Sequence, residues 1–420
     1  MALLATILKK YLGDGCTDFP VFGEEFDSLV RPSLQVAIDG MLQTFKASTL
    51  GGVVERGQRA TLARMVDHEN ATDFPVGPVE FVDCDLGCGE RLACVRRGLY
   101  LLESECGDRS VVLLNTTDSC PTKIRLEIMA GKRQVAESLL RHLANVARTG
   151  EAYRGRVFSL ELGSDRTLRA KFHSLPQINP DSIILPERLL ERIERHTIDF
   201  SRRAARLRQS GCRLKRGLLL HGSSGTGKTL TTRYLVSSME NRTVIMLQGD
   251  SAELIESACR LASTLEPSTV ILEDINRIGT GRQGPAAGAS EVVFELVSQM
   301  DKVSDDLDVL FVLTTNRIDG LESPLASCPG RIEEAFELPL PDEDCRKRLL
   351  TLYGRGFNLD PQVAESFAIR LESASAAFIS ELLRKAALLA AEDDSQVITI
   401  RQHHLEDALT ELLVVGGRLH

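Results

Sequence analysis

The sequence predicts an α/β fold built on a parallel sheet, with an α+β domain before the sheet and a small helical domain after it. Four apolar strands alternate with helical stretches between residues 217 and 313, a pattern typical of a parallel sheet covered on both faces. Short strands separated by glycine-containing turns occupy residues 76–120. Helical periodicity alone follows Pro341. A chain of 420 residues has room for two or three such domains.

Composition and charge narrow the classes of protein to consider. Apolar residues make up 43% of the chain and charged residues 26%, as in soluble globular proteins. The net charge of −9 argues against a protein that mainly coats nucleic acid. No apolar run reaches the roughly 18–20 residues that span a bilayer. The apolar start precedes Lys9 and Lys10, the reverse of a secretory signal, so we expect a cytoplasmic protein without a membrane span.

The ten cysteines are expected to be free thiols in a reducing compartment. Four of them form a loose cluster in the sequence: Cys84, Cys88, Cys94 and Cys106. Zinc sites usually contain two pairs, each spaced by two to four residues, and only the first pair fits here. The spacing therefore favours ordinary thiols and leaves a metal site as the alternative.

The amino-terminal domain is expected to cover residues 1–175. Its first 75 residues are expected to be helical, because Phe26, Leu34, Ile38 and Met41 recur at roughly helical spacing. The remainder is expected to contain a helix over 132–148 and strands over 78–83, 93–102, 110–115, 157–162 and 168–172. No chemical motif is found in this domain, and we assign it to partner recognition.

The sheet of the second domain, residues 176–340, carries the motifs. Its strands are expected over 217–221, 243–247, 269–272 and 309–313. The third domain, residues 341–420, is expected to be helical only, with its last helices over 376–391 and 403–413.

A glycine-rich segment follows the first of these strands and opens a helix over 230–238. It fits the pattern G-x-x-x-x-G-K-[ST], whose backbone N–H groups surround nucleotide phosphates. Lys228 would reach the β- and γ-phosphates of ATP, and the hydroxyl of Thr229 would take a position on Mg²⁺. A chance glycine-rich turn is disfavoured by the strand before the segment and the helix after it. The predicted nucleotide-binding residues are Gly222, Ser223, Ser224, Gly225, Thr226, Gly227, Lys228, Thr229 and Leu230.

Two adjacent carboxylates, Glu273 and Asp274, follow the strand over 269–272. We expect Glu273, with Thr229, to complete the Mg²⁺ shell, and Asp274 to orient and deprotonate the attacking water. Two acids could also mark a solvated strand end. Their place after Lys228 in one alternating α/β region favours the catalytic interpretation.

The strand over 309–313 leads to Asn316, a polar amide expected beside the phosphates. Such an amide can sense the γ-phosphate and position water. Arg331 follows in Pro-Gly-Arg and is a candidate cation for charge that develops in phosphoryl transfer. Both are predicted catalytic residues.

Together these motifs resemble the AAA ATPase family over about residues 178–413. The resemblance rests on Walker A (222–229), Walker B (269–274), the sensor strand (315–317), Pro-Gly-Arg (329–331), Leu-Pro-Leu-Pro-Asp (338–342) and a helical lid whose helix ends at 385–391. It implies ATP and Mg²⁺ as cofactors and a ring homo-oligomer, usually a hexamer. In such a ring, Arg331 would act on the nucleotide of the neighbouring subunit, and Asn316 would be sensor 1.

The sequence departs from the family pattern in four places. Walker B reads Glu273-Asp274 instead of Asp-Glu, an order shared with the mitochondrial AAA ATPase that moves a folded Rieske iron–sulfur protein. Cys328 stands where a first finger arginine is frequent, and Ser223-Ser224 replaces Pro-Pro. The connection over 248–255 lacks the aromatic residue of threading unfoldases, and no Phe, Tyr or Trp occurs between Asn241 and Val293.

The leading hypothesis is an ATP-driven remodeller or switch of a protein partner, which residues 1–175 would select without pore threading. A nucleic-acid motor or loader is the second hypothesis, because residues 201–216 hold seven basic side chains and no acids. It is disfavoured by the acidic net charge and the lack of interleaved aromatics. A scaffold that binds ATP and turns it over slowly is the third. The glycine- and alanine-rich stretch over 279–289 is expected to be a surface loop or a second pore loop.

Overall fold

The fold comes from a computed structural model that describes residues 4–54, 60–67, 74–87, 89–116, 123–163, 168–247, 252–275, 285–316, 332–391 and 397–414. The chain divides into two compact units, Met1–Ser174 and Leu175–His420. Each unit is described by itself below. The α/β fold class predicted for the motif-bearing region is confirmed by the parallel sheet of the second unit.

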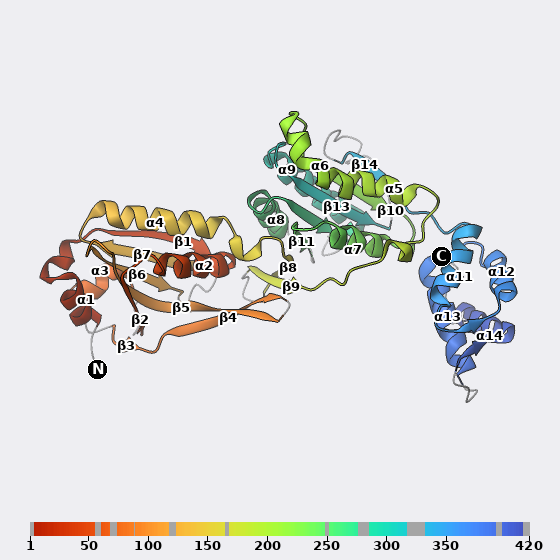
Figure 1. Ribbon diagram of the computed structural model, residues 1–420, viewed down its shortest axis with the longest axis horizontal. Coiled ribbons are helices and arrows are strands. Elements are labelled where there is room, and N and C mark those ends of the chain that lie inside the picture. Colours follow the sequence, from red (N-terminus) through yellow and green to blue (C-terminus); the bar gives the residue numbers. More distant parts are fainter. Residues whose placement is uncertain are drawn as a thin grey trace. The chain divides into compact units, whose positions relative to one another are not determined.

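The first unit contains an antiparallel sheet with helices on both faces (Figure 1). Its strands follow the order β1-β7-β6-β5-β2-β3, and β4 pairs with the other half of the long strand β5. The strands are β1 (Val21–Asp27), β2 (Ala47–Val53), β3 (Val76–Gly77), β4 (Glu80–Gly87), β5 (Glu90–Glu103), β6 (Arg109–Asn115) and β7 (Lys123–Ala130). A hairpin of β8 (Val157–Leu162) and β9 (Leu168–His173) follows.

Strand alternation in the first unit divides its core in two. Val112 and Leu114 of β6 pack with α2 (Arg31–Leu42) and α4 (Arg133–Arg148). Val111 and Leu113 pack instead with α1 (Leu4–Leu12) and α3 (Leu62–Val66). Neighbouring residues of a strand point to opposite faces of the sheet. A continuous apolar run such as β6 therefore packs against the helices on both faces.

The expectation that residues 1–75 are helical is wrong in part. Phe22 and Phe26 lie on β1, which pairs in antiparallel register with β7, and β2 is a second strand in this region. A spacing of four residues suits a helical face, but it is also a multiple of the strand period of two. The periodicity that identified α2 therefore misassigned the neighbouring strand.

The second unit is built on parallel strands in the order β14-β10-β13-β12-β11. Helices α7 (Lys228–Ser238), α8 (Ala252–Thr264) and α9 (Pro285–Lys302) alternate with them (Figure 1). The strands are β10 (Arg216–His221), β11 (Thr243–Leu247), β12 (Ser268–Leu272), β13 (Val309–Thr315) and β14 (Glu334–Glu337). Helices α5 (Leu189–Glu194) and α6 (Phe200–Gln209), joined by a π-helical turn over Arg195–Asp199, precede β10.

The lid that follows is mainly helical, with its own apolar core. Its helices are α11 (Glu343–Tyr353), α12 (Pro361–Arg370), α13 (Ala376–Ala390) and α14 (Gln402–Val414). The expectation of helices alone is corrected by a short parallel pair, β15 (Asn358–Leu359) and β16 (Thr399–Ile400). A strand of two residues is too short to show the alternation of apolar and polar residues by which strands are predicted from sequence.

Two further segments differ from expectation. Helix α9 begins at Pro285, so residues 285–289 are helical and not part of a loop. Pro at a first helical position removes no needed N–H donor, which explains a helix start inside an alanine- and glycine-rich stretch. Residues 279–284 lie outside the described residues.

A buried charge cluster joins the amino ends of four parallel strands. Arg242, just before β11, binds both carboxylate oxygens of Asp308, just before β13, at 2.9 Å. Its Nε also donates to Oγ1 of Thr269 at 2.8 Å. Arg216, the first residue of β10, donates to the same carboxylate at 3.1 Å and stacks on the ring of Phe200. Burial opposes ionisation of Asp308, but the two arginines prevail and lower its pKa.

We predict that Asp308→Asn lowers the free energy of unfolding by about 3–5 kcal/mol, because two buried guanidiniums lose their counter-charge. Urea unfolding followed by circular dichroism measures this. Glu187→Gln, at a side chain that is 90% exposed, is the control and should change stability by less than about 0.5 kcal/mol. The wild-type contribution should be complete above the unfolded pKa of about 4 and disappear as pH falls through the lower folded pKa. An Asp308→Asn protein as stable as the control would contradict the role of the cluster.

Candidate nucleotide site

The loop between β10 and α7 has a backbone that requires glycine at two positions. Gly222 has φ +142°, and a Cβ there would lie 2.2 Å from the carbonyl oxygen of Leu338. Gly225 has φ +80°, and a Cβ there would lie 2.7 Å from Oγ of Ser375. Residues that have a side chain rarely adopt such φ values. Glycine therefore allows this turn, whereas any other residue would place its Cβ against the neighbouring atoms.

Lys228 is the first residue of α7 and its side chain folds back over the loop. Its Nζ donates to the carbonyl oxygens of Gly222 and Ser223, both at 2.8 Å, and the residue is only 6% exposed. Burial lowers the pKa of Lys228, and the charge of Asp274 opposes that change. No side chain caps the amino end of α7. A cation, uncapped N–H groups and a positive helix end therefore converge where phosphates would bind.

Asp274 is held in a fixed position after β12. Its φ of +50° is left-handed, its N–H donates to Oγ1 of Thr314 at 2.9 Å, and its Oδ1 accepts from Nδ2 of Asn316 at 3.0 Å. Glu273 precedes it and is half-buried. Burial raises the pKa of Glu273, Arg233 on α7 opposes the rise, and Asp274 adds to it.

The structure thus brings Asp274 and Asn316 into contact and sets Lys228 within electrostatic range. Thr229 and Leu230 are exposed in the first turn of α7. Thr226 is buried and donates to the carbonyl oxygen of Ser223. Ser223 and Ser224 are exposed, and Gly227, the residue just before α7, has φ +100°. Arg331 lies outside the described residues.

Sequence reasoning assigned no role to Thr314 or Arg233. Thr314 is 1% exposed and follows five apolar residues of β13, and a polar residue near the carboxyl end of a parallel strand is the signal that could have found it. Arg233 carries no such signal, because an arginine on a helix usually faces solvent.

The lid contacts the phosphate loop directly. Ser375 caps α13 by accepting from the N–H of Phe378, and the N–H of Ala377 donates to the carbonyl oxygen of Gly225 at 3.1 Å. The same two lid residues surround the position of a Gly225 Cβ. A movement of the loop would therefore displace the first turn of α13 or break its contacts with Gly225.

Residues 218–340 match the model of the family described as "ATPase family associated with various cellular activities (AAA)". Residues 218–340 of the chain are therefore similar to the AAA family, and they hold the loop of Lys228, both carboxylates and Asn316. ATP with Mg²⁺ is the cofactor of this family, and the loop, Lys228 and the two carboxylates fit it.

Curated relatives agree with this placement. The chain is 31% identical to the proteasome-activating nucleotidase of Methanosphaerula palustris over 46% of this chain and 50% of that protein. It is 31% identical to a 26S proteasome regulatory subunit 4 homolog of Oryza sativa subsp. japonica, over 45% of each chain. It is 28% identical to the ATP-dependent zinc metalloprotease FtsH 2 of Sphaerobacter thermophilus, over 61% of this chain and 41% of that protein. The chain therefore spans half or less of the length of these relatives.

Two searches of the described residues bear on other classes of site. No described helix has the length and apolar character needed to cross a membrane. Within the same residues, no group of three or more metal-binding side chains is found. Cys84 on β4 and Cys94 on β5 are diagonal neighbours in the register of the two strands, and the Cys94 thiol donates to the carbonyl oxygen of Leu92 at 3.6 Å. Cys106 is exposed beyond the far end of β5, and Cys88 lies outside the described residues.

We predict that Thr314→Val lowers ATP turnover by about 10²-fold while ATP affinity is unchanged, because the Asp274 N–H loses its acceptor and the carboxylate loses its position. Steady-state kinetics and calorimetric titration with ATP measure the two quantities. Thr314→Ser keeps the hydroxyl and should stay close to wild type. Equal turnover in the valine and serine variants would show that Thr314 does not position Asp274.

Proposed function

We propose that this chain hydrolyses ATP with Mg²⁺ and uses the reaction to remodel or switch a protein partner. The observation that supports this best is the position of Asp274, whose backbone N–H binds Thr314 and whose carboxylate binds Asn316, within electrostatic range of Lys228. A general base can act only when it lies within hydrogen-bond reach of the proton that it removes. The contacts with Thr314 and Asn316 hold Asp274 in one position for this role.

Each residue has a role in this proposal. Lys228 would exchange its two loop carbonyls for the β- and γ-phosphates, and Thr229 and Glu273 would hold Mg²⁺. Asp274 would take a proton from the attacking water, while Asn316 orients that carboxylate. Arg331 would contact the nucleotide of a neighbouring subunit in a ring homo-oligomer, usually a hexamer in this family.

The left-handed backbone at Asp274 offers a reason for the inverted acid order. Asp and Asn are enriched among non-glycine residues with positive φ, because their short polar side chains can form local hydrogen bonds. A glutamate at 274 would have one methylene more and a less favourable backbone. The shorter carboxylate and the αL turn therefore suit each other.

A protein partner is favoured over nucleic acid by the ion pairs of the basic stretch over 201–216. Six of its seven basic residues contact an acidic side chain: Arg202 and Arg203 contact Asp199, Arg208 contacts Glu266, Arg213 and Lys215 contact Asp305, and Arg216 contacts Asp308. Charges already paired within the chain release fewer counterions on binding phosphates. Relatives named as proteasome regulators and as a protease point the same way.

The amino-terminal domain, residues 1–175, is the proposed site of partner selection. Action without threading is supported by the absence of aromatic residues between Asn241 and Val293. Residues 248–251 lie outside the described residues. Leu254 is buried in α8, which begins at Ala252, so it belongs to the core and not to a loop that could grip a substrate.

Lys228→Ala should abolish ATP binding, whereas Asp274→Asn should bind ATP and lose turnover by roughly 10²–10⁴-fold. Calorimetry gives binding and phosphate release gives turnover. Lys171→Ala, at a lysine exposed in the first unit, is the control for Lys228→Ala. Loss of turnover in Glu273→Gln, with little effect of Asp274→Asn, would reverse the roles of the two acids. Wild-type turnover near zero would favour a scaffold.

The proposal that the protein acts without threading predicts that a folded fluorescent domain fused to the true partner keeps its fluorescence during ATP turnover. The partner itself would be released or rearranged, which gel filtration detects. An Asp274→Asn variant is expected to trap the partner for identification, since it would bind ATP without completing the cycle. Processive loss of fluorescence would mean that the chain threads its substrate.

A further inference from the structure

A cavity of about 490 Å³ lies within the first unit, between the start of α2, strand β4 and the β8–β9 hairpin. Arg31, Cys84, Ala170 and Phe172 are among the residues that line it. Its volume falls in the range of about 300–1,000 Å³ typical of small-ligand sites. No residue of the nucleotide site takes part.

Arg31, which lines this cavity, carries a buried charge that has no acidic partner among the described residues. The residue is 8% exposed, and its guanidinium donates to the carbonyl oxygen of Val95 at 3.3 Å and to Oγ1 of Thr116 at 2.8 Å. Both acceptors are neutral, and no carboxylate of the described residues forms an ion pair with Arg31. Burial lowers its pKa. Burying a cation without an anion lowers the stability of the folded state. We therefore expect the charge of Arg31 to bind an anionic group of a ligand.

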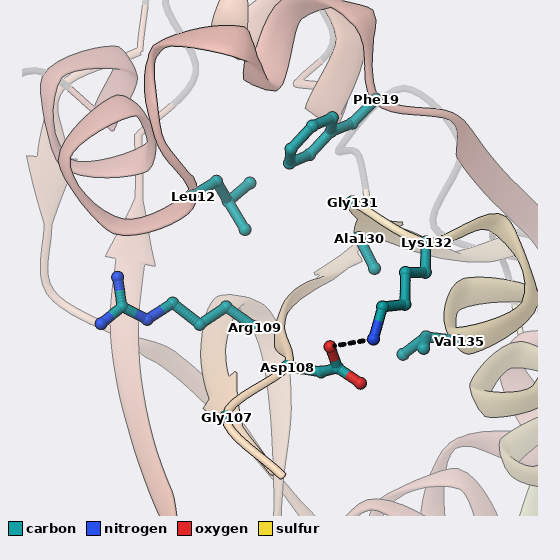
Figure 2. A pocket seen from close by; sticks show the side chains of 9 residues that line it. All are labelled: Leu12, Phe19, Gly107, Asp108, Arg109, Ala130, Gly131, Lys132 and Val135. Atoms are coloured by element: carbon teal, nitrogen blue, oxygen red, sulfur yellow. Dashed lines mark hydrogen bonds and ion pairs between the residues drawn. The ribbon is translucent and has the colours of Figure 1, made fainter.

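Two comparable cations of this unit, Arg97 and Lys132, do have acidic partners. Arg97 is 7% exposed, much like Arg31, and its guanidinium binds Glu80 at 3.1 Å. Lys132 lines a second cavity, of about 360 Å³, where its Nζ binds Asp108 at 2.8 Å (Figure 2). In that view Lys132 and Asp108 point toward each other, while Arg109 extends away from them. The second cavity thus holds its own ion pair, whereas the guanidinium of Arg31 binds only neutral acceptors among the described residues.

Further groups at the Arg31 cavity can bind an oxyanion. Oγ of Ser28, which lines the cavity, is buried and has no hydrogen-bond partner. Arg31 is the first residue of α2, which continues a 3-10 turn over Ser28–Val30. Asp27 caps that turn by accepting from the N–H of Leu29, and the N–H of Arg31 donates to the carbonyl oxygen of Ser28, so the guanidinium of Arg31 and the hydroxyl of Ser28 are the groups left for an oxyanion. Two acids, Asp83 and Asp85, and two further cations, Arg96 and Arg169, also line the cavity, so its charges beyond Arg31 balance and favour a ligand with a single oxyanion group.

We propose that this cavity binds a small ligand through one oxyanion group, a phosphate or a carboxylate, placed against the side chains of Arg31 and Ser28. The less charged remainder of the ligand lies along Ala170, Phe172 and Cys84. Binding there is independent of ATP hydrolysis at the other unit. It would make the partner-recognition domain responsive to a small molecule.

Cys84 reports on occupancy, because its thiol lines the cavity. The full-length chain is alkylated with iodoacetamide at increasing concentrations of inorganic phosphate or succinate, and the rate at each cysteine is read by peptide mass spectrometry. We expect at least one anion to slow alkylation of Cys84 saturably, by about tenfold, as expected when a ligand at about ten times its Kd occupies the site. The exposed Cys106 and Cys212 serve as internal references and should react at unchanged rates. Protection by only one of the two anions supports the proposal and identifies the oxyanion.

Variants separate the cavity from general anion effects. Arg31→Met removes the charge and should abolish protection, Arg31→Lys should retain part of it, and Lys132→Met is the matched control with wild-type protection. Ala170→Phe fills the cavity without touching Arg31 and should also abolish protection, which keeps the test decisive if Arg31→Met does not fold. Absence of saturable protection by either anion, or full protection in Arg31→Met or Ala170→Phe, overturns the proposal. A Lys228→Ala chain should protect Cys84 normally, so failure here is distinct from failure at the nucleotide site.

Discussion

The parallel order β10-β13-β12 is the constraint on which the nucleotide site depends. His221 at the end of β10 is in register with Thr315 of β13, and Leu272 at the end of β12 is in register with Leu313. Because all three strands run in the same direction, their chains leave the sheet at the same edge. The loop of Lys228, the amide of Asn316 and the carboxylate of Asp274 therefore meet, although nearly 90 residues separate the first from the second.

The opposite edge of the same sheet holds the strands in that register. Asp308 accepts from Arg242 and Arg216, so the starts of β10, β11 and β13 share one buried carboxylate. A buried ion pair contributes little net stability compared with apolar packing, yet one that is broken costs several kcal/mol. A shift in the register of these strands would separate Asp308 from its arginines and leave the charges buried without partners. The amino edge thereby fixes the geometry that the carboxyl edge uses for chemistry.

The sequence allowed much of the second unit to be predicted, and the reason is physical. Continuous apolar strands and a glycine-rich turn before a helix have few alternative structures, so β10 to β13 and α7 were predicted within a few residues. The contact of Asn316 with Asp274 follows from strand order, which motif spacing alone does not give. The backbone of Asp274, its bond to Thr314 and the strand β1 were not foreseen, because φ, cross-strand pairing and edge position leave no periodic signal. The un-neutralised Arg31 was likewise invisible, because burial and the absence of an acid are tertiary facts.

The contact between the loop and the lid suggests how a local change at the phosphates reaches the rest of the second unit. Lys228 at present satisfies the carbonyls of Gly222 and Ser223, and a phosphate that attracts its ammonium must release them. These carbonyls belong to the same short loop as Gly225, whose carbonyl accepts from Ala377 at the start of α13. Gly222 in turn lies against the carbonyl of Leu338, where the chain leaves β14 toward the lid. Because neither glycine position leaves room for a Cβ, the loop cannot shift far without moving the lid. We therefore expect a nucleotide that displaces the loop to displace the lid as well, through the contacts of Gly225 with α13 and of Gly222 with Leu338.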